Sequence, residues 1–250
     1  MRRRVIAGNW KMYKTAAEAR AFFSAFAPLV PGANKCDIVI APPFTAIQPA
    51  VEFAKGTNIA IGGQDVFWGN EGAFTGEVSA PMLVEAGCRY VIIGHSERRQ
   101  YFGEANETVA KKTKAALAAG LTPIVCIGET LEHRERGETE IICKTQFTGG
   151  VGALTPDEFS RILIAYEPLW AIGTGKTATP QIAAEVHRFV RQCALAKFSA
   201  EQASALRILY GGSVKHDNIH GLMAEEELDG ALVGGASLDP KSFASIVDAC

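Results

Sequence analysis

Short runs of apolar, often β-branched residues recur along the whole chain at nearly even intervals. Each run is continuous rather than alternating with polar residues, which is typical of strands buried on both faces, as in a parallel sheet covered by helices. The segments between the runs carry helical signals. We therefore expect eight strands, at Val5–Ala7, Ile38–Ala41, Ile59–Ile61, Tyr90–Ile93, Ile124–Ile127, Ile162–Tyr166, Ile208–Tyr210 and Ala231–Val233.

Two of the intervening segments show where helices begin and end. Asn106 is expected as the N-cap of one helix, and Gly120 as the residue just beyond its end. A second helix is expected to follow Thr179 as cap, with Pro180 in its first turn. Its apolar residues fall three and four apart, which predicts a buried face formed by Ile182, Val186, Phe189 and Cys193.

Alternation of strand and helix predicts an α/β fold. Eight units in 250 residues are about 31 residues each, the size of one strand-loop-helix unit of a closed (β/α)8 barrel. An open doubly wound sheet would usually carry G-x-G-x-x-G after its first strand, whereas this chain has Gly8-Asn9-Trp10-Lys11 there. No low-complexity linker divides the chain. We therefore expect a single barrel domain over residues 1–250, with eight parallel strands surrounded by helices.

Composition excludes several classes of protein. The 25 Lys and Arg residues and 27 Asp and Glu residues give a net charge of −2, so nothing favours nucleic acid as a partner. No apolar run approaches the roughly 18 residues of a membrane span, and we expect no membrane association. The basic residues Arg2–Arg4 are followed by too few apolar residues to form a secretory signal.

The six cysteines are scattered, with no C-x-x-C pair and no histidine at metal-ligand spacing. This pattern predicts reduced thiols and a cytoplasmic protein, without a structural metal site.

Polar residues and glycines cluster directly after the predicted strands. Because the carboxyl ends of barrel strands meet on one face, these residues are expected to surround a single site. They are Asn9, Lys11, Gln64, Asp65, His95 to Glu97, Glu129, Glu167, Gly211 to Ser213, Gly234 and Gly235.

Glu167 ends a strongly apolar strand and is followed by Pro168. A carboxylate partly removed from water is a stronger base, so this position suits a general base. A glutamate at the rim in an ordinary salt bridge is the alternative interpretation.

His95 and Ser96 lie where a helix begins. The positive end of a helix dipole disfavours imidazolium, which predicts a neutral histidine that donates a hydrogen bond. Alternatively, Ser96 is a plain N-cap with His95 packed beside it. A serine hydrolase is not favoured, because Arg98 replaces the second glycine of G-x-S-x-G.

Glycine pairs follow the last two predicted strands, at Gly211-Gly212 and Gly234-Gly235. Glycines let backbone N–H groups approach an oxyanion closely, and barrel enzymes often bind phosphate between these two loops. Either pair alone is equally consistent with a tight turn. Lys11 fits three interpretations: a fixed positive charge, a Schiff-base nucleophile or a solvated surface lysine.

Residues 168–177 contain G-K-T, yet Trp170 stands where a nucleotide P-loop requires glycine. Small residues bounded by Pro168 and Lys176 suit a mobile lid instead, in which Gly173 offers a backbone N–H to an anion. An exposed loop without that role is the alternative.

Six motifs occur in an order that resembles the triosephosphate isomerase family. The likeness runs from residue 5 to about residue 247. The motifs are G-N-W-K, G-A-F-T-G-E, G-H-S-E-R-R, A-Y-E-P-L-W-A-I-G-T-G-K, Y-G-G-S and V-G-G-A.

The resemblance implies a TIM barrel that interconverts dihydroxyacetone phosphate and D-glyceraldehyde 3-phosphate with no cofactor or metal. It implies that Glu167 is the base and His95 the electrophile; the family is itself the standard example of a neutral catalytic histidine beneath a closing loop. Lys11 would supply positive charge and Asn9 a hydrogen bond at the same substrate oxygens. Glu97 matches a supporting carboxylate, which orients Lys11 and neighbouring loops.

The resemblance also assigns the phosphate site and the lid. The phosphate would meet backbone groups of Gly173, Ser213, Gly234 and Gly235. The lid would consist of Pro168, Leu169, Trp170, Ala171, Ile172, Gly173, Thr174, Gly175, Lys176 and Thr177.

The family's loop with Phe74 and Thr75 inserts into a second subunit, which implies a homodimer. Two residues depart from the family pattern: Asp65 stands where asparagine is usual, and Leu169 replaces the more common valine. We expect Asp65 to place an extra negative charge near the interface and Leu169 to alter loop packing rather than chemistry.

Two other functions stay open at this point. One is an aldolase that forms an imine on Lys11, and the other is an inactive phosphate-binding barrel. The joint presence of Lys11, His95 and Glu167 disfavours the second, because binding phosphate needs none of their proton chemistry.

Overall fold

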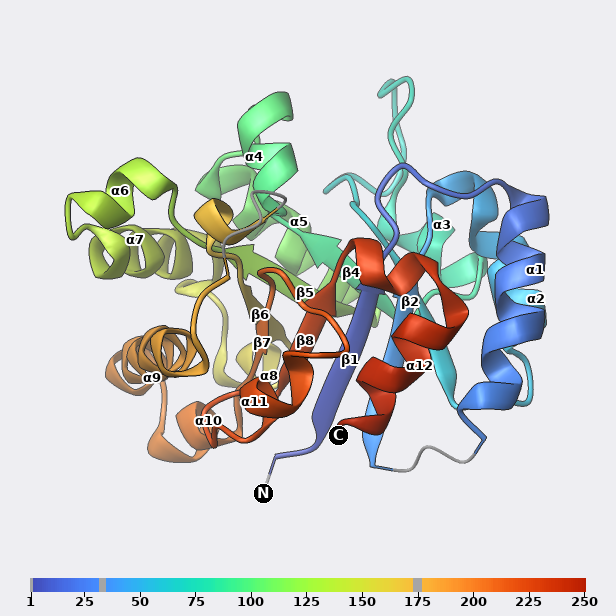
Figure 1. Ribbon diagram of the computed structural model, residues 1–250. Helices are drawn as coiled ribbons and strands as arrows, with labels where there is room; N and C mark the ends of the chain where they lie inside the picture. The colour runs from blue at the N-terminus through green and yellow to red at the C-terminus, as the bar shows by residue number, and fades with distance from the viewer. Residues whose placement is uncertain (1, 32–34, 173–176) are drawn as a thin grey trace.

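The computed structural model describes residues 2–31, 35–172 and 177–250. Within these residues eight parallel strands close into a barrel in chain order, and β1 pairs with β8 (Figure 1). The strands are β1 (Arg4–Asn9), β2 (Cys36–Ala41), β3 (Ile59–Gly63), β4 (Tyr90–Ile93), β5 (Thr122–Ile127), β6 (Leu163–Tyr166), β7 (Arg207–Tyr210) and β8 (Gly230–Val233). The prediction of a closed (β/α)8 barrel is therefore confirmed.

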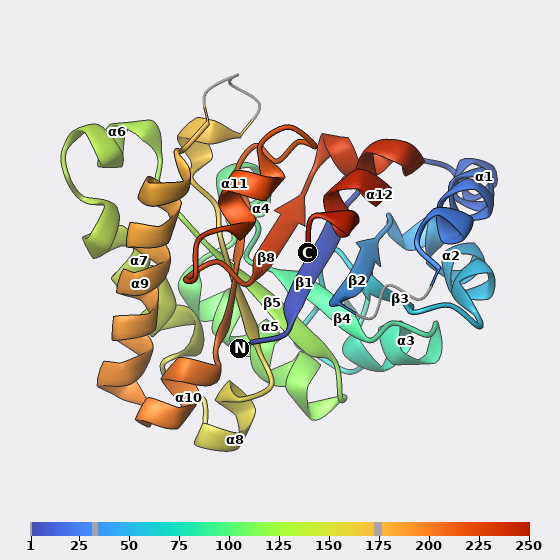
Figure 2. The ribbon, with the colours of Figure 1, turned by 60° about the horizontal axis from the view of Figure 1, so that its bottom comes forward.

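Helices surround the barrel (Figure 2). The α-helices are α1 (Ala16–Phe26), α2 (Ile47–Ala54), α3 (Ala80–Glu85), α4 (Ser96–Phe102), α5 (Asn106–Ala118), α6 (Leu131–Glu135), α7 (Thr139–Val151), α8 (Pro156–Phe159), α9 (Pro180–Lys197), α10 (Ala200–Ala205), α11 (Ile219–Met223) and α12 (Pro240–Asp248). Short 3₁₀ segments are η1 (Ala27–Leu29), η2 (Phe44–Ala46), η3 (Leu169–Ala171) and η4 (Gly235–Leu238).

The strands bury side chains on both faces, which explains their continuous hydrophobicity. Along β1, Val5 and Ala7 belong to the apolar cluster inside the barrel, whereas Ile6 belongs to the layer between strands and helices. Both layers are dry and apolar, so they hold the strand ends at fixed positions.

Local capping signals define most helix ends. Thr179 begins α9 as predicted, because its Oγ1 accepts a hydrogen bond from the Ile182 N–H at 3.2 Å. Gly120 follows α5 in the left-handed region, with φ of 88°. The predicted N-cap of α5 was wrong by one residue: Ala105 occupies that position, because the side chain of Asn106 instead accepts a hydrogen bond from Arg99.

The buried face of α9 is rotated from the predicted one. Val186 is buried as expected, whereas Ile182, Phe189 and Cys193 are only partly buried. The fully buried positions lie on the adjoining side of the helix and, apart from one valine, they are alanines and a histidine. These positions include Ala183, His187, Val190 and Ala194.

None of the helices in the described part of the chain combines the length and the apolar character needed to cross a membrane.

Candidate active site

The carboxyl ends of the strands open on a cavity of about 500 Å³. Side chains from the ends of β1, β4 and β6 reach it, and the glycine-rich loops after β7 and β8 also line it. The residues proposed from sequence that line it are Asn9, Lys11, His95, Glu167, Ile172, Ser213, Gly234 and Gly235. The structure thus brings together residues spread over most of the chain. Gly173, Thr174, Gly175 and Lys176, proposed as phosphate and lid residues, lie outside the described residues.

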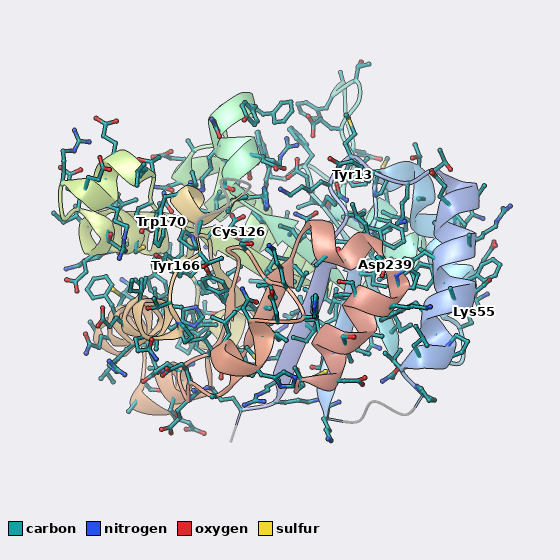
Figure 3. All side chains as sticks on the ribbon, in the orientation of Figure 1. Tyr13, Lys55, Cys126, Tyr166, Trp170 and Asp239 are labelled. Atoms are coloured by element: carbon teal, nitrogen blue, oxygen red, sulfur yellow. The ribbon has the colours of Figure 1, made fainter. Side chains whose placement is uncertain are left out.

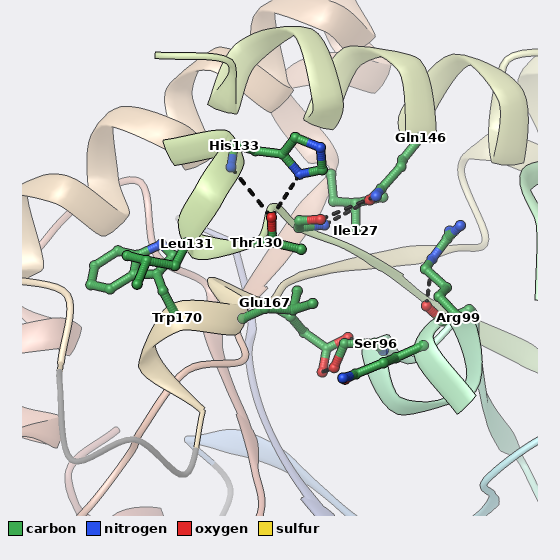
Figure 4. Close-up of a pocket in the computed structure, with 13 residues that line it drawn as sticks. Ser96, Arg99, Ile127, Thr130, Leu131, His133, Gln146, Glu167 and Trp170 are labelled. Carbon is green, nitrogen blue, oxygen red and sulfur yellow. Dashed lines mark hydrogen bonds between the residues drawn. The ribbon is translucent and has the colours of Figure 1, made fainter. Parts of the chain in front are cut away.

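The carboxylate of Glu167 is buried and turned toward the start of α4 (Figure 4). Its Oε2 accepts a hydrogen bond from the Ser96 N–H at 2.9 Å, and its Oε1 lies 2.9 Å from His95 Nε2 and 3.2 Å from Ser96 Oγ. Burial raises the pKa of Glu167, but His95 and the Ser96 N–H outweigh burial, so the net shift is downward. The sequence argument from burial alone therefore fails for this arrangement, in which Glu167 is held as a weakly basic carboxylate.

His95, rather than Ser96, is the N-cap of α4. Its Nδ1 accepts a hydrogen bond from the Glu97 N–H at 3.2 Å, which requires an unprotonated Nδ1 and leaves Nε2 to donate to Glu167. Burial lowers the pKa of His95, whereas the nearby Glu167 carboxylate raises it above the ordinary value. The hydrogen-bond geometry fits the neutral Nε2–H tautomer, and the upward pKa shift depends on Glu167 staying in contact.

Lys11 is held by its backbone as well as by its side chain. It has φ of 53°, in the left-handed region that non-glycine residues seldom adopt. Asn9 Oδ1 accepts from the Lys11 N–H at 3.0 Å, and Gln64 Nε2 donates to the Lys11 carbonyl at 2.9 Å. Lys11 Nζ donates to Glu97 Oε1 at 2.5 Å. Glu97 thus contacts Lys11, while Asn9 and Gln64 support the strained turn.

Two glycines make room for Glu167, and sequence reasoning did not single out this role. A Cβ at Gly211 would lie 2.8 Å from Glu167 Cγ, and a Cβ at Gly128 would lie 1.8 Å from the Glu167 carbonyl oxygen. Both glycines directly follow a strand, β7 and β5 respectively. Their position directly after the two strands that flank β6 is the sequence signal that could have pointed to this role.

The first residues of the proposed lid are bonded to Glu129. The Leu169 N–H donates to the Glu129 carbonyl at 3.0 Å, and Trp170 Nε1 donates to Glu129 Oε1 at 2.9 Å. The hydroxyl of Tyr166 donates to the same Oε1 at 3.0 Å, so Tyr166 and Trp170 lie close together (Figure 3). The position of Glu129 after a strand was visible in the sequence, but its hydrogen bonds to Leu169 and Trp170 were not.

Glu167 also borders a second cavity, of about 540 Å³. Leu169, Trp170 and Leu131 form its apolar part. Residues of α4, α6 and α7 also line this cavity. Leu169 and Trp170 therefore face the cavity as well as bonding to Glu129.

A sequence model of the triosephosphate isomerase family matches residues 4–250. The chain belongs to the triosephosphate isomerase family. A triosephosphate isomerase of Solibacter usitatus (strain Ellin6076) is 61% identical over 248 residues, which cover 99% of this chain and 100% of that protein. Those of Geotalea uraniireducens (strain Rf4) and Moorella thermoacetica (strain ATCC 39073 / JCM 9320) are each 55% identical, over 99% of this chain and 98% and 99% of the respective proteins.

Asp65, expected from the resemblance to add a negative charge near an interface, is buried within the fold of this chain. Its carboxylate lies 2.7 Å from Lys112 Nζ and 2.9 Å from Arg98 Nη2. Glu104 contacts the same two cations at 3.1 and 2.9 Å and accepts a hydrogen bond from the Gly94 N–H at 3.1 Å. The extra negative charge is therefore neutralised by paired cations next to the loop that carries His95.

The loop expected to meet a partner in this family projects from the barrel rim, where Phe74 is 49% exposed and Thr75 is exposed (Figure 1). Phe74 also packs on Phe67, with ring centroids 4.3 Å apart, which stiffens the loop.

Across the described residues, no three His, Cys, Asp or Glu side chains come close enough together to hold a metal ion.

Proposed function

We propose that the cavity bordered by Glu167, His95 and Lys11 is where this chain carries out the reaction of its family. That reaction is the aldose-ketose isomerisation of dihydroxyacetone phosphate and D-glyceraldehyde 3-phosphate, and the chain is an isomerase. One observation carries the assignment of the site. A carboxylate, an imidazole and an ammonium from three separate strand ends converge on one cavity between two glycine-rich loops.

In the proposed mechanism Glu167 takes a proton from one substrate carbon and returns it to the neighbouring carbon. Removal of the proton leaves an enediolate, whose oxygens carry the developing negative charge. His95 Nε2–H and Lys11 Nζ would hydrogen-bond these oxygens, and Asn9 would assist, because prearranged dipoles and charges stabilise such intermediates strongly. Returning the proton to the other carbon completes the isomerisation and restores the carboxylate.

The resting contacts of Glu167 indicate how its basicity changes during the reaction. Bonds from Ser96 and His95 lower its pKa in this arrangement. When Glu167 leaves Ser96 to reach the substrate, it loses a hydrogen bond that stabilises the charged form, so burial then makes it a stronger base. His95 is freed at the same time to donate its Nε2–H to substrate.

For the phosphate we propose backbone groups of Ser213, Gly234 and Gly235, with Gly173 completing the set from the lid. Ser213, Gly234 and Gly235 border the same cavity as Glu167, and Gly234 lies close to the Lys11 side chain. We propose that residues Pro168 to Thr177 close over this cavity and exclude water from the enediolate.

An imine-forming aldolase is less well supported. Lys11 Nζ is in an ion pair with Glu97 at 2.5 Å, whereas an imine-forming lysine is usually desolvated or lies beside another cation. The role that fits this contact is fixed positive charge, with Glu97 as the residue that orients it.

The test is a coupled assay with D-glyceraldehyde 3-phosphate on the wild type and on Glu167→Gln. We expect kcat to fall by about three orders of magnitude or more, since the base is removed. The affinity for 2-phosphoglycolate is expected to persist, because the phosphate loops are unchanged. A variant that keeps a tenth of the wild-type kcat would exclude Glu167 as the base.

We also propose that the chain forms a homodimer through the loop with Phe74 and Thr75, that residues 1–250 form one domain, and that the protein is cytoplasmic. The projecting loop and the exposed aromatic residues near it support the dimer. The closed barrel, which leaves every strand paired on both sides, supports a single domain. The scattered cysteines support the cytoplasmic location.

A further inference from the structure

Two cysteines from distant parts of the sequence meet at the amino end of the barrel, on the opposite side from the cavity. Cys36 is the first residue of β2 and is 2% exposed. Cys250 follows α12, is partly exposed and packs against the same apolar layer that contains Cys36. Figures 1 and 2 both show the end of the chain beside the start of β2. The side chains of Cys36 and Cys250 are close enough to interact by hydrogen bonding.

The surroundings of this pair lower the pKa of the Cys36 thiol. The hydrogen bond from Cys250 lowers the pKa of Cys36 most, Arg3 and Arg4 lower it further, and burial and Asp37 oppose them. The net shift is downward. The pKa of Cys250 is raised, so the proton stays on Cys250.

The other four cysteines lack this environment. Burial raises the pKa of Cys88, Cys126, Cys143 and Cys193. Their thiols are therefore poor nucleophiles. Only Cys36, among the cysteines described, combines a lowered thiol pKa with a second thiol close by.

We propose that Cys36 and Cys250 are a dithiol modification site that a peroxide converts into a reversible disulfide. The Cys36 thiolate attacks one oxygen of hydrogen peroxide, the O–O bond breaks, and hydroxide leaves, giving a sulfenic acid at Cys36. The Cys250 sulfur then attacks the Cys36 sulfur and forms the S–S bond. The sulfenic oxygen leaves as water, carrying the Cys250 proton. Two thiols are oxidised and one peroxide is reduced to two waters.

The disulfide would join the end of α12 to the start of β2 and so enclose most of the chain in one loop. Closing so long a loop restricts the unfolded chain, which stabilises the folded state. The pair lies at the opposite end of the barrel from Glu167 and Lys11. Oxidation is therefore expected to raise thermal stability and to leave the isomerase rate unchanged.

The experiment treats the purified full-length protein with hydrogen peroxide, quenches it with a thiol-alkylating reagent and examines it by mass spectrometry without reduction. We expect the intact mass of an aliquot that has not been alkylated to fall by about 2 Da, the mass of two hydrogens, and a peptide linking Cys36 to Cys250 to appear in the alkylated sample. The Tm is expected to rise by roughly 5–15 °C and to return after dithiothreitol treatment.

Three serine variants separate the steps. In Cys250→Ser, dimedone is expected to trap sulfenic acid at Cys36, because the second thiol is missing. In Cys36→Ser, neither the linked peptide nor a rise in Tm is expected. Cys193→Ser removes another partly exposed thiol and is expected to form the disulfide as the wild type does.

Three results would overturn the proposal. The first is a disulfide between two chains, and the second is a link between Cys143 and Cys193. The third is wild-type protein in which peroxide has oxidised the other thiols while Cys36 and Cys250 can both still be alkylated. All of these leave the isomerase activity of the untreated protein unaffected.

Discussion

The proposed base depends on a residue that has no side chain. Gly211 follows β7 directly, and a Cβ there would lie 2.8 Å from Glu167 Cγ and 3.1 Å from the Tyr166 carbonyl oxygen. Neither the carboxylate stem nor the strand backbone behind it can move away without disturbing other contacts. The position of Glu167 is thus set by a neighbour's lack of bulk as much as by its own hydrogen bonds.

We predict that Gly211→Ala lowers kcat by roughly 10–100-fold, because displacing a catalytic group by about 1 Å has costs of this size. Binding of 2-phosphoglycolate is expected to weaken much less, since the phosphate loops keep their backbone. Steady-state kinetics and inhibitor titration measure the two effects.

The matched control for that variant is Gly221→Ala in α11, where an added Cβ would find only Pro180, at an ordinary 3.5 Å. This control is expected to keep wild-type kinetics. A kcat for Gly211→Ala within twofold of the wild type would show that Glu167 is not confined in this way.

At the scale of elements, α9 packs a histidine against the barrel. His187 is fully buried, its Nδ1 lies 3.3 Å from the Glu227 carbonyl oxygen, and its Nε2 finds no hydrogen-bond partner among the described residues. Its ring meets Tyr166 of β6 edge-on, with centroids 5.9 Å apart. Burial lowers the pKa of His187 to about 3, so the residue is neutral in the folded protein.

This depressed pKa predicts acid sensitivity. Below pH 6.5 His187 is protonated in the unfolded chain, whereas in the folded chain it stays neutral until the pH falls to about 3. Stability contributed by the neutral ring is therefore complete above pH 6.5 and falls by about 1.4 kcal/mol per pH unit as the pH drops toward 3. Urea unfolding at pH 7, 6, 5 and 4 measures this slope.

In His187→Phe, which keeps an aromatic ring and removes the titrating group, we expect a flatter dependence of unfolding free energy on pH. His220→Gln changes an exposed histidine and should follow the wild type. Equal slopes for His187→Phe and the wild type would contradict the assignment. A single unfolding transition in these curves is also expected if residues 1–250 form one domain.

The elements were predictable from sequence to the extent that local patterns encode them. All eight strands followed from apolar runs such as Tyr90–Ile93, because both faces of each strand are buried. The orientation of α9 did not follow, because alanines and a histidine occupy its buried side and hydrophobicity does not mark them.

The candidate site shows the same division. The residues bordering the cavity followed from polar residues at strand ends and from resemblance to a family. The contact between Ser96 and Glu167 did not follow, because it joins residues 71 positions apart. The ion pairs of Asp65 with Lys112 and Arg98, which neutralise its charge, also join residues far apart in the sequence. They were therefore visible only in the structure.

At the scale of the whole molecule, one side of the barrel rim carries large apolar side chains facing solvent. Met12 is 93% exposed, Phe102 69%, Tyr101 68% and Phe74 49%. Large apolar side chains that face solvent in this way are typical of subunit interfaces. It supports the proposed homodimer.

We predict a dimer by sedimentation at micromolar concentration, and a shift toward monomer for Phe102→Asp, because a charge would be buried in the interface. Ile141→Asp alters a residue of α7 that is similarly exposed, at 63%, and is expected to remain dimeric. A wild-type sample that sediments as a monomer would refute the homodimer.

Because all eight strands run in the same direction, the cavity opens at one rim of the barrel only. The opposite rim is therefore the one at which chemical attachment would leave the cavity accessible. At the rim opposite the cavity, Asp37 forms ion pairs with Arg3 at 2.6 Å and with Arg207 at 3.0 Å. A solid support attached at that rim would hold the mouth toward the bulk liquid, open to diffusing triose phosphate. Random coupling through amines would also modify Lys11 at the cavity. An immobilised catalyst should therefore be attached at the rim where the strands begin.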